Sequence, residues 1–328
     1  MKKIILFYLL LSVSLIVEAK SPNQQKKDSK NSFLQYKNPI INNNLADPFV
    51  KYEDGYYYFF STGEAVDHRF IPIYRSKDLS KWEFMHGAVA KGGKNDWNYK
   101  NFWAPEVLKY KGKFYLYYTA SPDSTPVNTG NRVGVAVANH IEGPYTNLGV
   151  VIPNASIDGH PVLDRDGSLY IFYTIERENK KGYVAGQIFV DKMISPSQVS
   201  NYPTPIITHH IWQEGPFVLY RGGTYFLTYS VGNWGDSTYH IRYSTSTSIM
   251  GPYTEQPDTI LKSNEMVKGP GHHSFFRDPA GRDWIVYHGW DTAYTARYPR
   301  IDRILVKNKK ITSNGPTFTS QRVSFKEK

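Results

Sequence analysis

The sequence of 328 residues contains no cysteine. This absence excludes a disulfide framework, thiolate metal sites, iron–sulfur clusters, a cysteine nucleophile and a bacterial lipoprotein anchor. Long apolar runs are missing beyond the first 17 residues, and no later segment has the periodicity of an amphipathic helix. The length allows two or three domains or one large all-β domain. The chain must therefore be held together by its core rather than by covalent links.

The formal net charge of +10 is concentrated at the two ends of the chain. Residues 1–38 carry seven Lys and two acidic residues, and residues 297–328 carry nine basic and two acidic residues. The stretch between them, 39–296, therefore has a net charge of −2. A polyanion-binding surface needs its basic residues on the folded face, so we expect no nucleic acid partner.

The N-terminus has the features of an export signal. Two lysines precede an apolar run from Ile4 to Val17, which is followed by Glu18-Ala19. A basic start, a run that is short for a membrane span and a small residue at its end predict a cleaved signal peptide over residues 1–19. An uncleaved anchor is the alternative.

The polar, lysine-rich residues 20–36 predict a flexible tether. A single domain is expected over residues 37–328. We therefore expect a secreted or periplasmic protein without membrane insertion after signal cleavage, whose oligomeric state the sequence leaves open.

Aromatic residues are abundant, with 26 Tyr, 17 Phe and 7 Trp, and such rings pack well on pleated strands. They recur in five similar patterns. Each pattern has a short apolar strand, a tight turn such as Asp54-Gly55 or Gly222-Gly223, and an aromatic strand such as Tyr56–Phe60. Asp-Gly and Gly-Gly supply the positive φ angles of two-residue turns. The patterns therefore predict β-hairpins.

The hairpins recur at a nearly constant spacing. Their anchor positions lie 57, 55, 56 and 57 residues apart, at Val50, Val107, Val162, Val218 and Phe275. Further strand-like stretches between them give four strands per repeat, as in a propeller blade. The sequence thus predicts one all-β, five-bladed β-propeller. We expect the last strand, Ile301–Val306, to close the ring by pairing near Asn38–Ile41. A β-sandwich is the alternative fold, but it does not require this spacing.

Acidic residues occupy the entries of three repeats. Asp47, Asp158 and Glu214 each stand beside an apolar strand and next to Gly or Pro. A lone carboxylate at such a place contributes little to packing and is costly to bury. In a propeller the innermost strands line the central channel, so the fold would bring all three to one end of it. Each acid alone is compatible with a structural turn, but three at corresponding positions favour acid–base chemistry.

In their order and spacing, five motifs resemble those of glycoside hydrolase family 43, which comprises inverting, five-bladed propellers. The motifs are Ala46-Asp47-Pro48, Trp103-Ala104-Pro105-Glu106, Ile157-Asp158-Gly159-His160, Glu214-Gly215-Pro216 and Gly269-Pro270-Gly271-His272. The resemblance extends over roughly residues 38–310. It implies that Asp47 is the general base and Glu214 the general acid, while Asp158 orients Glu214 and modulates its pKa. Inverting glycosidases need one protonated and one ionised carboxyl group.

The resemblance also implies that His272 lies in the central channel near the substrate and that Arg297 faces the substrate. Trp103, at the entry of the second repeat, is expected to stack on a sugar ring; packing in the core is the alternative. Adjacent strand residues point to opposite faces, so His272 and His273 are not expected to share one ion. We expect no cofactor for the chemistry, and a structural Ca²⁺ or Na⁺ in the channel that His272 holds through water.

The resemblance allows α-L-arabinofuranosidase, β-xylosidase and endo-1,5-α-L-arabinanase activities on oligo- or polysaccharides. Family β-xylosidases often carry a C-terminal β-sandwich, whereas this sequence ends 22 residues after Val306. We therefore expect an exo-acting α-L-arabinofuranosidase that acts on arabinan or arabinoxylan fragments of plant cell walls. A non-catalytic carbohydrate-binding propeller is an alternative from another class, but such a module would not need the full carboxylate trio.

Overall fold

The structure is a computed structural model that describes residues 33–126, 130–177, 182–206 and 211–324. These residues form strands, turns and loops, and no helix occurs among them. The described part of the chain accordingly has no helix that is long and apolar enough to cross a membrane. The predicted signal peptide, residues 1–19, and residues 20–32 of the predicted tether lie outside the described residues.

Five antiparallel sheets, each built from consecutive strands, make up the body of the fold. The first two sheets are β2 (Phe49–Glu53), β3 (Tyr56–Phe60), β4 (Phe70–Ser76) and β5 (Glu83–Val89), then β6 (Lys100–Tyr110), β7 (Lys113–Ser121), β8 (Arg132–Ala138) and β9 (Thr146–Val150). The third is β10 (Ser156–Leu163), β11 (Leu169–Ile175), β12 (Ile188–Ser195) and β13 (Gln198–Val199), with β14 (Thr204–Pro205) also pairing with β12. The last two are β15 (Gln213–Arg221), β16 (Thr224–Val231), β17 (His240–Ser246) and β18 (Thr254–Leu261), then β19 (Lys268–Arg277), β20 (Asp283–Trp290), β21 (Arg297–Lys307) and β22 (Lys310–Ser313).

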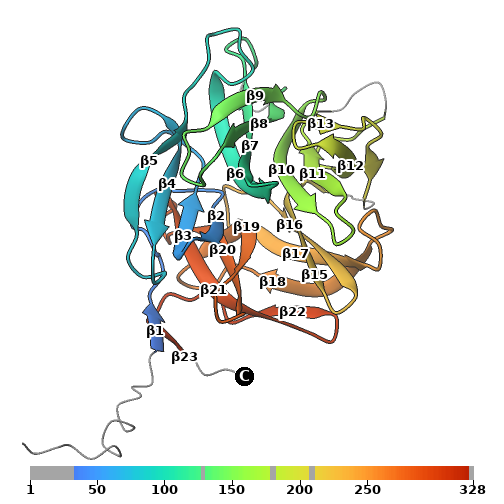
Figure 1. The fold of residues 1–328 in the computed structure, drawn as a ribbon. Coiled ribbons are helices and arrows are strands. Elements are labelled where there is room, and N and C mark those ends of the chain that lie inside the picture. The colour runs from blue at the N-terminus through green and yellow to red at the C-terminus, as the bar shows by residue number, and fades with distance from the viewer. Residues whose placement is uncertain (1–32, 127–129, 178–181, 207–210, 325–328) are drawn as a thin grey trace, which may run out of the picture. The chain divides into compact units, whose positions relative to one another are not determined.

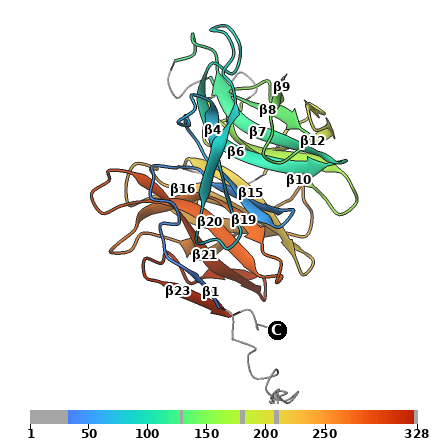
Figure 2. The ribbon, with the colours of Figure 1, turned by 60° about the vertical axis from the view of Figure 1, so that its left-hand side comes forward.

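The five sheets follow one another around a central axis, as Figure 1 and the rotated view of Figure 2 show. The first strands of neighbouring sheets, β2, β6, β10, β15 and β19, contact one another in a closed ring. These innermost strands surround the central channel, and the fold is the predicted five-bladed β-propeller. The alternative of a β-sandwich was wrong. A further small sheet pairs β1 (Phe33–Tyr36) with β23 (Gln321–Ser324).

The predicted hairpins are the first two strands of each blade. The turn between β2 and β3 places Asp54 at φ 46° and Gly55 at φ 86°, the left-handed conformations that a two-residue hairpin turn needs. The aromatic second strands carry many of the fully buried side chains, among them Phe59, Tyr117 and Tyr173. The core therefore lies between adjacent blades, where these rings pack.

The expected strand pairing of Ile301–Val306 with N-terminal residues is not formed, because these residues belong to β21, the third strand of the fifth blade between β20 and β22. The N-terminal segment nevertheless lies beside β21 as a loop. Asn38 Nδ2 donates to the carbonyl of Ile301 (2.8 Å) and Asn38 Oδ1 accepts from its N–H (2.9 Å). The N–H groups of Ile40 and Leu45 donate to the carbonyls of Pro299 (3.0 Å) and Arg297 (2.9 Å). Pro39 follows without a backbone N–H, so a regular ladder cannot continue there.

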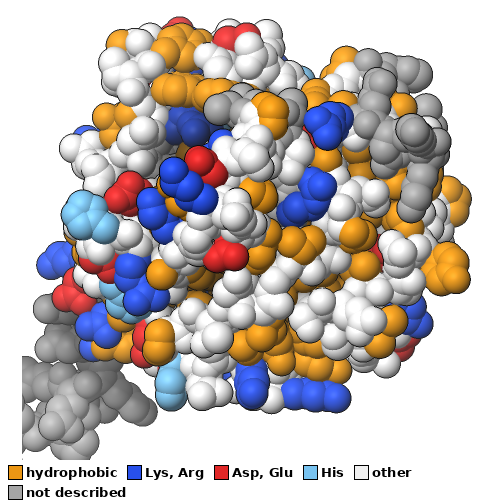
Figure 3. All heavy atoms as spheres, turned by 90° about the horizontal axis from the view of Figure 1, so that it is seen from above, with side chains coloured by type: hydrophobic (Ala, Val, Ile, Leu, Met, Phe, Trp, Pro, Cys, Tyr) orange, Lys and Arg blue, Asp and Glu red, His pale blue; other side chains and the backbone are white. Residues whose placement is uncertain are grey.

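Charged side chains are mixed on the face seen in Figure 3, where Lys and Arg alternate with Asp and Glu. This agrees with the nearly neutral sequence between residues 39 and 296. No continuous basic surface for a polyanion appears on that face.

Candidate active site

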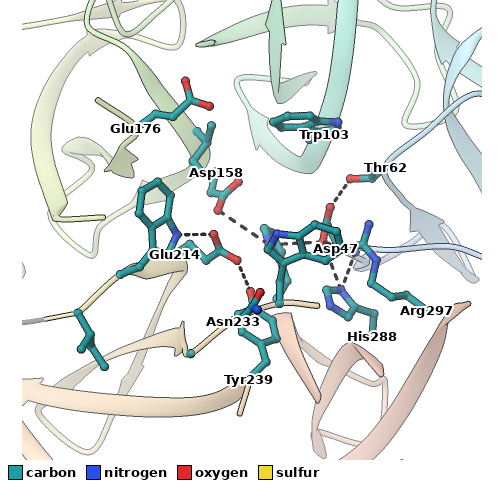
Figure 4. Close-up of a pocket in the computed structure, with 16 residues that line it drawn as sticks. Asp47, Thr62, Trp103, Asp158, Glu176, Glu214, Asn233, Tyr239, His288 and Arg297 are labelled. Atoms are coloured by element: carbon teal, nitrogen blue, oxygen red, sulfur yellow. Dashed lines mark hydrogen bonds and ion pairs between the residues drawn. The ribbon is translucent and has the colours of Figure 1, made fainter. Parts of the chain in front are cut away.

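One cavity of about 720 Å³ opens at an end of the central channel. All six residues selected from the sequence line it: Asp47, Trp103, Asp158, Glu214, His272 and Arg297. They come from all five blades, so the fold gathers side chains that lie up to 250 residues apart in the sequence. Figure 4 shows the carboxylates of Asp158 and Glu214 on one side of the cavity, with Asp47 across from them.

A left-handed residue occurs at the same place in every blade and directs side chains to the centre. Its φ is 52° at Asp47, 48° at Ala104, 61° at Asp158, 57° at Gly215 and 44° at His272. In the second to fifth blades the register between the first two strands shifts at this place. Such a bulge bends a strand and re-aims its side chains, and so the repeated backbone deviation creates the site.

A polar side chain of the preceding blade in the ring accepts a backbone hydrogen bond from each of these bulges. The N–H of Ala104 donates to Thr62 Oγ1 (2.9 Å), that of Asp158 to Thr119 Oγ1 (3.1 Å) and that of His272 to Ser230 Oγ (2.8 Å). In the fifth blade a histidine takes this place, and the N–H of Asp47 donates to His288 Nδ1 (3.1 Å). At the bulges these backbone N–H groups have no partner within their own sheet, and the side chains of the neighbouring blade accept their hydrogen bonds instead.

Asp47 is buried and surrounded by donors and positive charge. Thr62 Oγ1 donates to its Oδ2 (2.5 Å), Arg297 Nη1 lies 3.6 Å from its Oδ1, and His272 Nδ1 lies 3.5 Å from the same oxygen. Burial by itself would raise the pKa of Asp47, but the charges on His272 and Arg297 outweigh it and hold this pKa well below its usual range. Asp47 is therefore ionised at neutral pH.

His288 is neutral, because burial lowers its pKa to about 4. Its Nδ1 lies 3.1 Å from the backbone nitrogen of Asp47 and 3.2 Å from Asp47 Oδ1, whereas its buried Nε2 has no hydrogen-bond partner among the described residues. The ring stacks on Tyr239 with centroids 5.9 Å apart and planes 11° apart. His288 thus fixes the backbone of Asp47 without adding charge.

Asp158 has the opposite electrostatic character. Its Oδ2 accepts the N–H of Gly215 (3.0 Å), which ties it to the strand that carries Glu214. Burial raises the pKa of Asp158 to about 7, the charges of Glu214 and Asp47 act in the same direction, and His272 opposes them. Asp158 therefore retains a proton up to about neutral pH.

Two neutral donors fix the carboxyl group of Glu214. Tyr239 OH donates to Oε1 (2.6 Å), and Trp212 Nε1 donates to Oε2 (2.6 Å). Tyr239 is itself completely buried. These contacts leave Glu214 little freedom to rotate, which positions its oxygens for a group bound in the cavity.

Arg297 and Trp103 lie where the sequence predicted them, at the cavity wall. The guanidinium carbon of Arg297 lies 4.8 Å from the ring centroid of Trp234. Trp103 belongs to β6 and is half-buried rather than enclosed in the core, so one part of its ring is open to the cavity.

The adjacent histidines of β19 point to opposite faces, as expected. His272 lines the cavity, where burial opposes its charge but Asp47 and Asp158 raise its pKa. His273 is buried on the other face, with Nε2 2.6 Å from Thr228 Oγ1. Within the described ranges no group of three or more His, Asp or Glu side chains forms a metal site. The protein donors thus fit at most a hydrated cation beside the single ring of His272, and that ion stays a prediction.

Several cavity residues were not predicted from the sequence, namely Thr62, Glu176, Trp212, Asn233, Trp234, Tyr239 and His288. A signal for two of them was present. Thr62, Thr119, Thr174 and Ser230 recur at the 56-residue spacing near the ends of the second strands, and His288 continues that series. The others lie in loops or third strands, whose residues follow no repeat. His209 and His210, which precede Trp212, lie outside the described residues.

Residues 36–311 match the model of a family described as glycosyl hydrolases family 43. This chain belongs to that family. The enzyme is thus a glycoside hydrolase, as its cavity with two buried carboxyls, Asp47 and Asp158, and the half-buried Glu214 already suggested.

Two relatives show the range of activities in the family. The chain is 29% identical over 304 residues to β-D-galactofuranosidase xynD of Aspergillus niger, with 86% of each chain covered. It is 26% identical over 296 residues to the extracellular exo-α-(1→5)-L-arabinofuranosidase ArbA of Cellvibrio japonicus, with 76% of this chain and 80% of that one covered. A thermostable family-43 glycoside hydrolase of known structure has a TM-score of 0.78 and 27% identity, covering 89% of this chain and 100% of that chain.

Proposed function

We propose that this family-43 enzyme is an inverting, exo-acting α-L-arabinofuranosidase that releases terminal arabinofuranosyl units from arabinan or arabinoxylan oligosaccharides. The observation that carries the proposal is the electrostatic contrast across one cavity. Asp47 is held ionised by His272 and Arg297, whereas across the cavity burial raises the pKa of Asp158, the neighbour of Glu214, to about 7. Inversion requires a base and an acid on opposite faces of the sugar.

Asp47 acts as the general base in this proposal. A water molecule between Asp47 and the anomeric carbon gives its proton to an Asp47 oxygen as it attacks. Thr62 and the N–H contact to His288 fix the carboxylate, so that its position is set before the substrate binds. Arg297 and His272 face the substrate and offset the negative charge of Asp47.

Glu214 acts as the general acid and protonates the leaving oxygen of the glycosidic bond. Asp158 orients this acid, because through the N–H of Gly215 it fixes the start of the strand at Glu214. Trp103 offers a ring face to the C–H groups of the sugar. No step needs a metal or another cofactor, and a cation near His272 would have a structural role.

Export is part of the proposal. It rests on the predicted signal peptide over residues 1–19 and on the extracellular location given in the name of the Cellvibrio japonicus relative. A polymer of the plant cell wall is accessible only outside the cell or in the periplasm. A sugar polymer is also uncharged or weakly charged, which agrees with the nearly neutral sequence of the propeller.

A second candidate activity is β-D-galactofuranosidase, which the Aspergillus niger relative favours. The ring of β-D-galactofuranose has the same configuration as that of α-L-arabinofuranose, with one additional carbon in the exocyclic chain. The same acid and base could therefore serve both sugars. Which of the two sugars the enzyme prefers depends on whether the cavity has room for the additional hydroxymethyl group of galactofuranose.

A panel of p-nitrophenyl glycosides distinguishes the candidates. We expect the highest kcat/KM with the α-L-arabinofuranoside and lower values with the β-D-galactofuranoside and the β-D-xyloside. Debranched arabinan should yield arabinose from the start of the reaction, whereas an endo-arabinanase would yield oligosaccharides first. Sugar binding without hydrolysis of any substrate would indicate the non-catalytic alternative.

The roles of the carboxyls are tested in the same assay. Asp47→Ala and Glu214→Ala should each abolish turnover without loss of the folded state, because general acid–base catalysis contributes about 10²- to 10⁴-fold per group. Azide should restore activity to Asp47→Ala, with an anomeric configuration opposite to that of the substrate. Activity like that of the wild type in either variant would refute the assignment.

A further inference from the structure

We infer that Trp234, supported by Trp290, forms a second sugar-binding position beside the one at the catalytic carboxyls, where it binds the next sugar unit of the chain. The inference rests on the proposed function and deepens it, because it makes the preferred substrate an oligosaccharide rather than an isolated glycoside.

Trp234 is presented to solvent by an ordered loop. It is 47% exposed, an unusual state for so large an apolar side chain. The loop between β16 and β17 is fixed by its own hydrogen bonds, since Asn233 Nδ2 donates to Asp236 Oδ2 (2.9 Å) and the N–H of Thr238 donates to Asp236 Oδ1 (2.7 Å). These hydrogen bonds therefore hold the indole of Trp234 in its position at the cavity wall.

A second indole supports the first from behind. The rings of Trp234 and Trp290 stack with centroids 6.2 Å apart and planes 20° apart. Trp290 Nε1 also donates to the carbonyl of Trp234 (2.8 Å). Packing against Trp290 and the guanidinium of Arg297 accounts for the orientation of Trp234 and still leaves 47% of the side chain exposed.

The stacked pair Trp234 and Trp290, called the tryptophan platform here, lies beside the catalytic groups. Trp234 and Glu214 line the same cavity. Arg297 lies over the Trp234 ring and reaches Asp47, and Tyr239, the last residue of the loop, donates to Glu214. Asn233, the neighbour of Trp234, and Tyr239 both line the cavity (Figure 4). A cavity of about 720 Å³ is in the size range of sites for drug-sized ligands, so one pentose ring leaves part of it unfilled.

The chemistry of an exposed indole fits a sugar ring. Its flat apolar face covers the C–H groups of a sugar while the hydroxyls remain with polar neighbours, here Asn233 and Arg297. In an exo-acting enzyme the unit beside the terminal sugar is the leaving sugar. Trp234 therefore determines how strongly the enzyme distinguishes an oligosaccharide from a glycoside without a second ring.

The test compares Trp234→Ala with the wild type on two substrates, α-1,5-linked arabinobiose and methyl α-L-arabinofuranoside. We expect kcat/KM for arabinobiose to fall at least tenfold more than kcat/KM for the methyl glycoside, mainly through KM. Tyr202→Ala is the control, because Tyr202 is 82% exposed and does not line the cavity; it should leave both values unchanged. Equal falls for the two substrates would overturn the inference and leave the proposed function intact.

A binding experiment separates failure of the inference from failure of the proposed function. Arabinotriose is titrated into Glu214→Gln and into the double variant Glu214→Gln/Trp234→Ala, with tryptophan fluorescence or calorimetry as the readout. At least tenfold weaker binding by the double variant supports the inference that Trp234 binds a second sugar unit, and equal binding overturns this inference. If the wild type cleaves no furanoside, the proposed function is wrong, while this titration still decides on Trp234.

Discussion

Thr62 shows how much of the site depends on a residue that does no chemistry. Its hydroxyl donates to Asp47 Oδ2 and accepts the N–H of Ala104, so it joins the proposed base to the second blade. It has the same place in its blade as Thr119, Ser230 and His288. The position of Asp47 is therefore set by a network that extends across three blades.

Replacement of Thr62 by Val should lower kcat about tenfold to a hundredfold, because a hydrogen bond to a charged group contributes about 1.5–3 kcal/mol. The acidic limb of the pH–rate profile should also move to higher pH, since the ionised form of Asp47 loses a donor. Thr62→Ser keeps the hydroxyl and should restore both values. An unshifted acidic limb in Thr62→Val would assign Thr62 a purely structural role.

Asp158 makes stability depend on pH in a direction that is unusual for a carboxyl group. Its pKa is raised from 3.8 to about 7, so between these pH values the native state binds a proton that the unfolded chain releases. The contribution of Asp158 to stability therefore falls as pH rises through this window, and the full penalty is present above pH 7. Asp158→Asn removes the ionisation and should become more stable relative to the wild type between pH 4 and pH 8.

Thermal unfolding of both proteins at several pH values measures this difference. Asp47→Asn is the matched control, because the lowered pKa of Asp47 gives stability above pH 4 that is lost as pH falls. Its difference from the wild type should therefore have the opposite sign. A constant difference in Tm between Asp158→Asn and the wild type across the range would contradict the raised pKa.

At the scale of elements, the strand β19 carries a glycine, Gly271, that has no side chain. Its absence leaves room for Tyr239, which positions the proposed acid Glu214. A Cβ on Gly271 would lie 2.0 Å from Cε1 of Tyr239, the residue that donates to Glu214. The close approach of β19 to this ring therefore requires glycine at this position.

Gly271→Ala should displace Tyr239, lower kcat and destabilise the fold by about 1–3 kcal/mol, as overpacking of a core does. Gly93→Ala is the control, since its new Cβ would meet only Asp96 Oδ2 at 3.5 Å. Denaturant unfolding and kcat are measured for both variants. Wild-type behaviour of Gly271→Ala would mean that Tyr239 does not need its present position.

The sequence predicted the elements well where a repeat carried the information. The hairpins, their turns and the three acids recur at a spacing that one chain displays by itself. Trp234 and Tyr239 could not be found in this way, because the loops between the second and third strands differ in length from blade to blade and carry no repeated pattern. His288 was missed because a ring nitrogen replaces the hydroxyl of the other repeats as acceptor, a substitution that only the hydrogen-bond geometry reveals.

At the scale of the whole molecule, each blade is formed by consecutive strands, so no strand is shared between the first and the last blade. The sequence predicted the ring and the segment near Asn38–Ile41 that closes it, but not the form of the contact. This segment lies beside β21 as a loop: the Asn38 side chain satisfies both the N–H and the carbonyl of Ile301, and the N–H groups of Ile40 and Leu45 donate to carbonyls of β21. Sequence patterns do not report such a contact, because a polar side chain and isolated backbone hydrogen bonds replace a regular ladder.

Asn38→Ala should destabilise the protein by at least about 2 kcal/mol, because it leaves buried backbone groups of Ile301 without partners, at about 1–3 kcal/mol for each. Asn44→Ala is the matched control: Asn44 Oδ1 accepts the N–H of Arg297 (3.0 Å), but Asn44 is exposed and water can replace it. Equal stability losses in urea unfolding would show that Asn38 has no special role in closing the ring.

The central claim is that Asp47 and Glu214 act from opposite faces of a terminal arabinofuranosyl unit. Proton NMR during the first minutes of hydrolysis of an α-1,5-linked arabino-oligosaccharide tests it most directly, because the anomeric signals identify both the product and its configuration before mutarotation. Inversion of an α-linked terminal unit should give free arabinose that appears first as the β-anomer. Initial formation of α-arabinose, or of oligosaccharides without arabinose, would contradict it.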